Sequence, residues 1–303
     1  MSKPAGKIGF IGIGAMGAPM AGHLAKAGLP LVVFDRDAAR MKAFAQEHKV
    51  EAAADLADLG RHCDTVITML PDGRAVREVL CGTGDNFKDC VGAGLKRGAL
   101  VIDMSSSSPV STREVGALLE ERGVKLIDAP VSGGVKRAVT AELAIMVGGD
   151  AGALEACRPI VETLGNQIFH AGPLGAGHAI KALNNYVSAA GLVAACEAVI
   201  AGQRFGLDPN VVVDVLNASS GMNNTTKVKV KAFMLSGKFN AGFSTGLMAK
   251  DLRTALEVAE AVKGPAEMAR RTVAMWNEAE KAMGPGSDHT AMFKFLDEQS
   301  AKK

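Results

Sequence analysis

Three glycines near the N-terminus have the spacing of a phosphate-binding turn. Gly12, Gly14 and Gly17 form the pattern G-x-G-x-x-G in the stretch GIGAMG, which also contains Ala15 and Met16. The apolar run before this stretch predicts a short buried strand, and the apolar residues after it recur at helical spacing. Between a strand and a helix, glycine permits a tight turn and the close approach of a pyrophosphate, which the free N–H groups of the helix N-terminus bind. The stretch therefore predicts a dinucleotide site formed by these five residues.

The end of the second predicted strand indicates which dinucleotide binds. A strand is expected over residues 31–34, and Asp35 follows it directly. An acid at this place accepts a hydrogen bond from the ribose 2′-hydroxyl and repels a 2′-phosphate, which favours NAD. The guanidinium of the neighbouring Arg36 could instead pair with that phosphate. We predict NAD as the cofactor, with NADP as a second possibility.

Later stretches carry polar groups that could bind and convert a small acid. Ser132, Gly133 and Gly134 follow a predicted strand in DAPVSGG, and a hydroxyl with free backbone N–H groups in a turn can hold a carboxylate. Lys181 and Asn185 are four residues apart in a predicted helix, so their side chains project from the same face. Each stretch alone has a simpler interpretation, as a Gly-Gly turn or as a surface lysine with its charge in water.

The composition indicates a globular protein with a large core. The chain has 303 residues, 48% of them hydrophobic and 22% charged, which is enough for two domains. A net charge of +2 without a long basic run predicts no nucleic-acid partner. We see no apolar run that approaches a membrane span, and the first strand begins too early to leave room for a leader peptide. These features predict a cytoplasmic protein that does not bind membranes.

The cysteines predict neither a disulfide framework nor a metal site. Their number is odd and no pair has C-x-x-C spacing, so we expect reduced thiols and no bound metal. They are Cys63, Cys81, Cys90, Cys157 and Cys196.

Strand-like and helix-like segments alternate through the first half of the chain. Short apolar strands between helices predict a mostly parallel sheet, with ligands at the carboxyl ends of the strands. The pattern becomes entirely helical near Gly172, beginning with a long helix expected over residues 175–205. We predict an α/β Rossmann dinucleotide-binding domain over residues 1–171, followed by an all-α domain over residues 172–303.

The sequence resembles the β-hydroxyacid dehydrogenase family over nearly its whole length. Six stretches carry the resemblance, in the order of the family: GFIGIGAMGAPMAGHLAKAG, TMLP, DMSSSSP, DAPVSGG, GPLGAGHAIKALNN and LMAKDL. The resemblance implies hydride transfer between NAD and the carbon that bears the β-hydroxyl of a small carboxylic acid similar to 3-hydroxyisobutyrate. It also implies a homodimer or homotetramer.

The same resemblance implies a role for each matching residue. Lys181 would act as general acid/base on the hydroxyl proton, and Asn185 would orient the substrate. The turn at residues 132–134 would hold the substrate carboxylate, and Lys250, beside Asp251 in LMAKDL, would lie at the substrate and nicotinamide end of the site. The residues expected to line the cofactor elsewhere are Leu70, Pro71 and Ser106.

Departures from the family leave the substrate open. Family members usually continue DAPVSGG with small residues, whereas this chain has Lys136, Arg137 and Glu142 there. We hypothesise that Arg137 selects substrates with a second polar or anionic group, against the simpler interpretation of an arginine in solvent. Reduction of a tartronate- or sulfolactaldehyde-type semialdehyde remains an alternative. A non-catalytic dinucleotide-binding protein or an imine reductase is opposed by Lys181, because such relatives lack that lysine.

Overall fold

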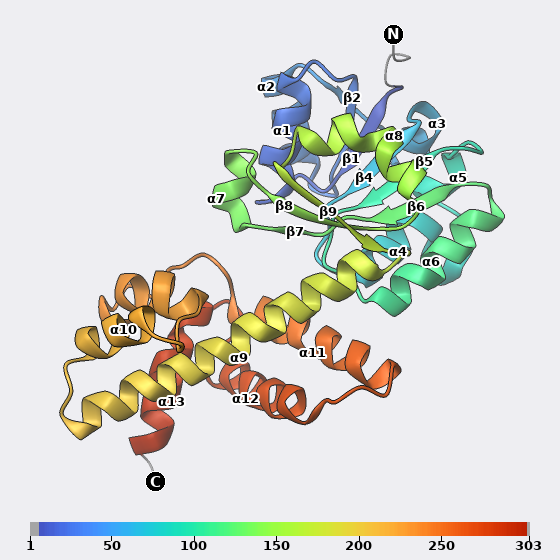
Figure 1. Cartoon of the computed structure of the whole chain (residues 1–303). Helices are drawn as coiled ribbons and strands as arrows, with labels where there is room; N and C mark the ends of the chain where they lie inside the picture. The colour runs from blue at the N-terminus through green and yellow to red at the C-terminus, as the bar shows by residue number, and fades with distance from the viewer. Residues whose placement is uncertain (1–5, 302–303) are drawn as a thin grey trace. The chain divides into compact units, whose positions relative to one another are not determined.

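The computed structural model describes residues 6–301 and divides the chain into two compact units, Met1–Lys181 and Ala182–Lys303 (Figure 1). In the first unit, the strands are β1 (Ile8–Ile11), β2 (Leu31–Phe34), β3 (Glu51–Ala52), β4 (Thr65–Thr68), β5 (Leu100–Asp103), β6 (Lys125–Asp128), β7 (Val131–Ser132), β8 (Ala144–Gly148) and β9 (Gln167–Gly172). Its helices are α1 (Gly17–Lys26), α2 (Ala38–His48), α3 (Leu56–His62), α4 (Gly73–Cys81), η1 (Thr83–Asp85), α5 (Val91–Gly94), α6 (Pro109–Glu121), α7 (Gly134–Val139) and α8 (Ala151–Glu162).

The strands of the first unit form one sheet in the order β3-β2-β1-β4-β5-β6-β8-β7, with β9 beside β8. The strands from β3 to β6 in this order are parallel, as expected. The order 3-2-1-4-5-6 is that of the Rossmann dinucleotide-binding fold. Beyond β6 the sheet is mixed, because β8 runs antiparallel to both β6 and β7.

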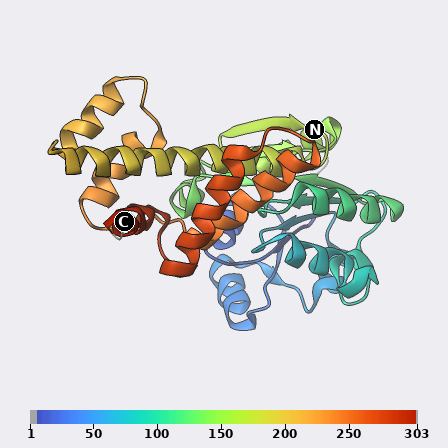
Figure 2. The ribbon, with the colours of Figure 1, turned by 90° about the horizontal axis from the view of Figure 1, so that it is seen from below.

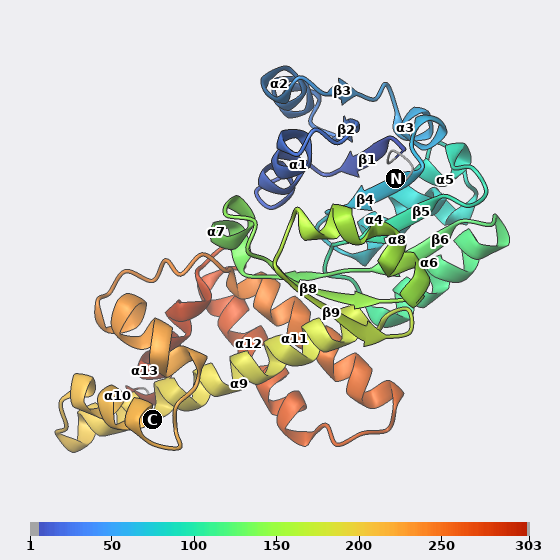
Figure 3. The same cartoon turned by 45° about the horizontal axis from the view of Figure 1, so that its top comes forward.

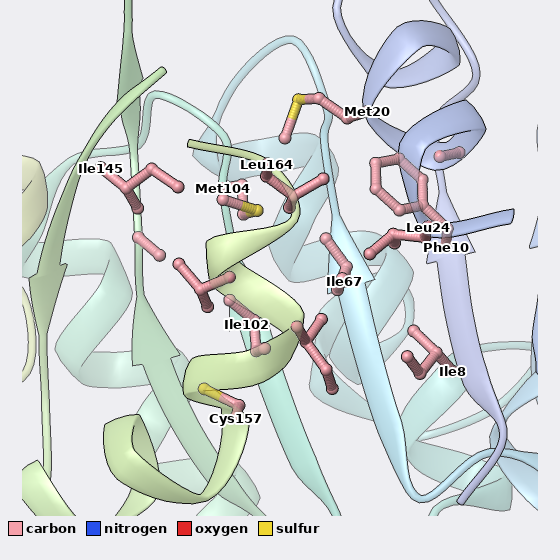
Figure 4. Close-up of a cluster of buried hydrophobic side chains, with 14 of the residues drawn as sticks. Ile8, Phe10, Met20, Leu24, Ile67, Ile102, Met104, Ile145, Cys157 and Leu164 are labelled. Carbon is pink, nitrogen blue, oxygen red and sulfur yellow. The ribbon is translucent and has the colours of Figure 1, made fainter. Parts of the chain in front are cut away.

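Helices cover both faces of this sheet, so its central strands are apolar on both sides. On β4, Val66 and the adjacent Ile67 are fully buried and pack into different clusters, because successive side chains of a strand point to opposite faces. Helices α1 and α8 supply one cluster, shown in Figure 4, with Met20, Leu24 and Cys157 against the strands. Helices α3, α4 and α6 supply the other (Figure 3). This double burial explains the near-continuous apolar runs in the sequence.

The second unit is helical over the residues that the structure describes, as the sequence predicts, apart from one isolated β-bridge between Ser244 and Asp288 (Figure 2). Its elements are the larger part of α9 (Ala176–Phe205), then α10 (Pro209–Ala218), the π-helix η2 (Thr225–Leu235), α11 (Thr245–Ala261), α12 (Glu267–Met283), η3 (His289–Ala291) and α13 (Met292–Ala301). Its core surrounds the fully buried Trp276, which packs with residues of α9 such as Leu192 and Cys196.

Helix α9 differs from one expectation. By length and composition alone its 30 residues could cross a membrane, with a mean hydropathy of 1.4 in the most apolar window, although the sequence suggested no run of that length. Of that window, 44% is buried inside the protein. The apolar side chains Leu192, Cys196 and Val199 lie in the core of the helical unit, so we interpret α9 as a core helix.

Candidate active site

The glycine turn between β1 and α1 has the geometry that pyrophosphate binding requires. Gly12 has a φ of 98°, and a Cβ at Gly17 would lie 1.8 Å from the carbonyl oxygen of Gly12. A Cβ at Gly14 would meet nothing within 4 Å. No side chain caps the first turn of α1, where Met16 is the N-cap residue, so no side-chain oxygen competes with an anion at this helix N-terminus. Within the turn, the N–H of Ala18 donates to the carbonyl oxygen of Gly14, and Pro19 has no N–H. These residues therefore fit a dinucleotide.

Asp35 at the end of β2 is buried and held by the backbone on both carboxylate oxygens. Its Oδ2 accepts the N–H of Ile13 at 2.7 Å, and its Oδ1 accepts the N–H of Asp37 at 2.9 Å. Arg40 Nη1 lies 3.7 Å from Oδ2 of Asp35. Arg36, in contrast, is exposed. The contact with Ile13 joins Asp35 to the glycine turn, so the structure brings these two predicted cofactor sites together.

The loops after β4 and β5 are joined by a network around Asp103. Its Oδ1 accepts the hydroxyl of Thr68 at 2.9 Å, and its Oδ2 accepts that of Ser107 at 3.0 Å. The two loops are also hydrogen-bonded to each other directly, because the N–H of Leu70 after β4 donates to Oγ of Ser105 after β5 at 2.9 Å. The predicted cofactor residues Leu70, Pro71 and Ser106 thus lie on two loops at neighbouring strand ends.

The predicted carboxylate turn connects β7 to the short helix α7. Gly133 and Gly134 have φ values of 132° and 64°, which residues other than glycine rarely adopt. The other end of α7 is attached to α1, because Nε2 of His23 lies 3.0 Å from the carbonyl oxygens of both Ala138 and Val139. Helix α7, which follows the carboxylate turn, is therefore joined through His23 to α1, which follows the glycine turn.

The beginning of α9 is fixed to the sheet by a buried carboxylate. Asp128, at the end of β6, accepts the N–H of Gly175 and the N–H of His178, each at 2.7 Å. The imidazole of His178 lies 2.8 Å from Oγ1 of Thr112 and 3.0 Å from the carbonyl oxygen of Ser105. The side chain of His178 is fully buried here, three residues before Lys181.

In the helical unit, Asp251 contacts two predicted site residues, Asn185 and Lys250. Asp251 accepts the side-chain amide of Asn185 at 2.6 Å on Oδ2, and Nζ of Lys250 lies 3.6 Å from its Oδ1. Asp251 is 5% exposed, although the Lys-Asp pair resembles a surface pair in the sequence. On α9 itself, Lys181 precedes Asn185 by one helical turn.

Neither unit offers a metal centre among the residues described. Across residues 6–301, no three His, Cys, Asp or Glu side chains are grouped so that they could hold an ion. The chemical groups at hand are therefore a lysine, an amide, hydroxyls and backbone N–H groups, which can bind anions and transfer protons.

Comparison with known families agrees with this geometry. Residues 7–172 match the model of the NAD binding domain of 6-phosphogluconate dehydrogenase. Residues 175–296 match the model described as NAD-binding of NADP-dependent 3-hydroxyisobutyrate dehydrogenase. Together the two matches cover both units of the chain.

Individual relatives extend over almost the whole chain. The 2-(hydroxymethyl)glutarate dehydrogenase of Eubacterium barkeri is 35% identical, with 97% of this chain and 96% of the relative covered. The NAD-dependent L-serine dehydrogenase of Pseudomonas aeruginosa is 36% identical, with coverages of 96% and 98%. The structure of 3-hydroxyisobutyrate dehydrogenase from Mycobacterium tuberculosis with L-serine has a TM-score of 0.87 at 34% identity, covering 96% of this chain and 99% of that one. This chain belongs to the β-hydroxyacid dehydrogenase family.

Proposed function

We propose that this NAD-dependent oxidoreductase oxidises the β-hydroxyl group of a small carboxylic acid similar to 3-hydroxyisobutyrate, with Lys181 as its general acid/base. The observation that carries the proposal is the position of Lys181 on α9. It stands one turn before Asn185 and three residues after His178, whose backbone and side chain are both fixed by buried partners. A catalytic group on a fixed helix can be held in one productive orientation.

The residues of the chain divide the chemistry between binding and proton transfer. NAD, when bound, supplies the acceptor of the hydride that leaves the carbon bearing the hydroxyl group. Nζ of Lys181 takes the hydroxyl proton as the C–O bond becomes a carbonyl, and returns it in the reverse reduction. The amide of Asn185, oriented by Asp251, donates a hydrogen bond to the substrate. The turn at residues 132–134 holds the carboxylate, and Lys250 supports the substrate at the nicotinamide end.

The cofactor roles follow the strand ends of the first unit. The glycine turn binds the pyrophosphate, and Asp35 accepts a hydrogen bond from the ribose 2′-hydroxyl, which makes NAD the preferred cofactor. Leu70, Pro71 and Ser106 line the dinucleotide. We assign the dinucleotide-binding domain to residues 1–171 and the helical substrate domain to residues 172–303, a division supported by the family models, which meet between residues 172 and 175.

We further propose that the protein acts in the cytoplasm as a homodimer or homotetramer. All five cysteines are free and buried, which suits a reducing compartment. Apolar side chains on α9 and α10 are exposed, among them Val187, Val211 and Val215, and contact with a second copy would bury them.

The test is a panel of β-hydroxy acids assayed for NADH formation at 340 nm. We expect turnover with 3-hydroxyisobutyrate and its close analogues, and none with the corresponding α-hydroxy acids, because the proposed reaction takes place at a carbon one position further from the carboxylate. Turnover confined to α-hydroxy acids, or none with any β-hydroxy acid in either direction, would contradict the proposal.

A further inference from the structure

Arg137 lies over the carboxylate turn. It is the fourth residue of α7, and helical side chains lean back toward the N-terminus of their helix. A Cβ built on Gly133 would lie 2.6 Å from Cδ and 2.7 Å from Cβ of Arg137. The aliphatic part of Arg137 therefore occupies the space above Gly133, so its guanidinium extends from a Cδ that lies beside the turn at residues 132–134.

The guanidinium of Arg137 has no partner among the described residues. Of the 14 arginines in the chain, 11 have a hydrogen bond, an ion pair or a ring contact within residues 6–301. The three exceptions are Arg36, Arg97 and Arg137. Arg36 adjoins the predicted ribose site, and Arg137 adjoins the predicted carboxylate turn.

The nearest acid along the chain is engaged elsewhere. Glu142 accepts the hydroxyl of Thr140 at 2.9 Å on Oε2, and its N–H donates to the carbonyl of Arg137 at 2.9 Å. The backbone of Glu142 is thus hydrogen-bonded to the backbone of Arg137, while its carboxylate is hydrogen-bonded to Thr140. An unpaired guanidinium keeps its planar set of N–H donors for an anion from outside the chain.

The helix that carries Arg137 is fixed at its far end. His23 of α1 holds the carbonyl oxygens of Ala138 and Val139, so α7 cannot turn away without breaking both contacts. Ala138, next to Arg137, is fully buried in the same core cluster as α1. Arg137 therefore projects from a supported helix and not from a free loop, although its own side chain is exposed.

We propose that Arg137 binds a second carboxylate of the substrate, so that dicarboxylic β-hydroxy acids are the preferred substrate class. The inference rests on the proposed function, in which residues 132–134 hold the first carboxylate. Arginine forms bidentate hydrogen bonds with a carboxylate, and such charged contacts change kcat/KM by about 10- to 100-fold.

The experiment compares two substrates that differ only in the second acid group. These are 2-(hydroxymethyl)succinate and its analogue in which the carboxylate remote from the hydroxymethyl carbon is a carboxamide. In the wild type, we expect kcat/KM to favour the dicarboxylate by at least 10-fold. Arg137→Ala should remove that preference and leave the carboxamide nearly unaffected. Arg137→Lys, which keeps the charge without the planar fork, should retain part of it.

The matched control is Lys136→Ala, which removes the adjacent exposed cation and should leave the substrate preference within about threefold of wild type. An unchanged preference in Arg137→Ala would overturn the inference. An equal loss for both substrates would also overturn it, because Arg137 would then act on the carboxylate that they share. Activity on monocarboxylates without activity on the dicarboxylate refutes this inference alone. A wild type inactive on every β-hydroxy acid refutes the proposed function itself.

Discussion

Asp128 and His178 are in contact twice. The carboxylate Oδ2 accepts the backbone N–H of His178 at 2.7 Å and lies 3.6 Å from Nδ1 of its ring. Both side chains are completely inaccessible to solvent. One end of a sheet strand thereby determines where the longest helix begins.

Replacement of His178 by alanine should destabilise the protein. The change leaves the buried Ser105 carbonyl without its partner and opens a cavity, which together cost about 2–4 kcal/mol. His178→Gln, with an amide that can donate and accept, should recover most of the loss. Urea unfolding followed by circular dichroism measures both variants. The control is His62→Ala on the exposed side of α3; a His178→Ala variant no less stable than this control would contradict the prediction.

Replacement of Lys181 by alanine should lower kcat by about 100- to 10,000-fold, because the positioned proton acceptor is lost. NADH binding, measured by fluorescence titration, should stay within about threefold of wild type, since the glycine turn and Asp35 are unchanged. Lys42→Ala, on the exposed side of α2, is the matched control and should keep full activity. If Lys181→Ala retains most of its turnover, another group transfers the proton.

Replacement of Asp35 by serine should shift the cofactor preference toward NADP. The change removes the charge that repels a 2′-phosphate and releases Arg40 from its 3.7 Å ion pair. We expect the ratio of kcat/KM for NADP to that for NAD to rise about 10- to 100-fold. In the double variant Asp35→Ser with Arg36→Ala, this ratio should be lower than in Asp35→Ser alone. Equal use of both cofactors by the wild type would show that Arg36 already outweighs Asp35.

The stability of the protein should fall as the pH drops from 6.5 toward 4, in part because of His289. Burial, aided by the positive charge of Lys229, lowers the pKa of His289 from 6.5 to about 4. Within this window the unfolded chain binds a proton that the folded chain does not. The contribution of His289 to the free energy of unfolding is therefore complete above pH 6.5. It is lost as the pH falls through 4, by about 3 kcal/mol at most.

His289→Gln, which cannot take up this proton, should show a correspondingly flatter dependence of the unfolding free energy on pH between 6.5 and 4. Urea titrations at a series of pH values provide the measurement, and the exposed His62→Gln should leave the wild-type slope in place. Parallel curves for wild type and His289→Gln would show that His289 is protonated equally in both states.

The cysteine thiols should not react with a disulfide reagent in the native protein. All five are buried, and burial raises the pKa of Cys63, Cys81 and Cys196 to about 12 and that of Cys157 to about 11. Since the thiolate is the reactive form, native protein at pH 8 should give almost no colour with 5,5′-dithiobis(2-nitrobenzoate). In urea, five thiols per chain should react. Rapid modification of native protein would contradict this expectation.

The nucleotide-binding half of the fold is readable from the sequence because its signals are local. The strand at residues 31–34 is a continuous apolar run, the strand at residues 100–103 begins with three apolar residues, and the glycine turn is defined by six consecutive residues. The start of α9 is likewise close to the expected one, Ala176 against residue 175. Such features depend on neighbours in the chain, so periodicity and turn chemistry are enough to locate them.

Other features depend on residues that are distant in the sequence. The contact of Asp128 with His178 spans 50 residues, and that of Asn185 with Asp251 spans 66. Only the fold determines which acid meets which partner, so Asp251 looks like half of a surface pair in the sequence. The reversed direction of β8 and the π-helix at Thr225–Leu235 have no local signature either.

Each compact unit consists of one uninterrupted stretch of chain, with the division between Lys181 and Ala182. A ribosome adds about 5–20 residues per second, so the remaining 122 residues, 182 to 303, require roughly 6–24 s of synthesis. The sheet, the glycine turn and the Asp128–His178 contact all lie in the part made first. The nascent nucleotide-binding unit thus has seconds in which to fold before the helical unit is complete. Mutations that slow folding of the helical unit should leave that first step intact.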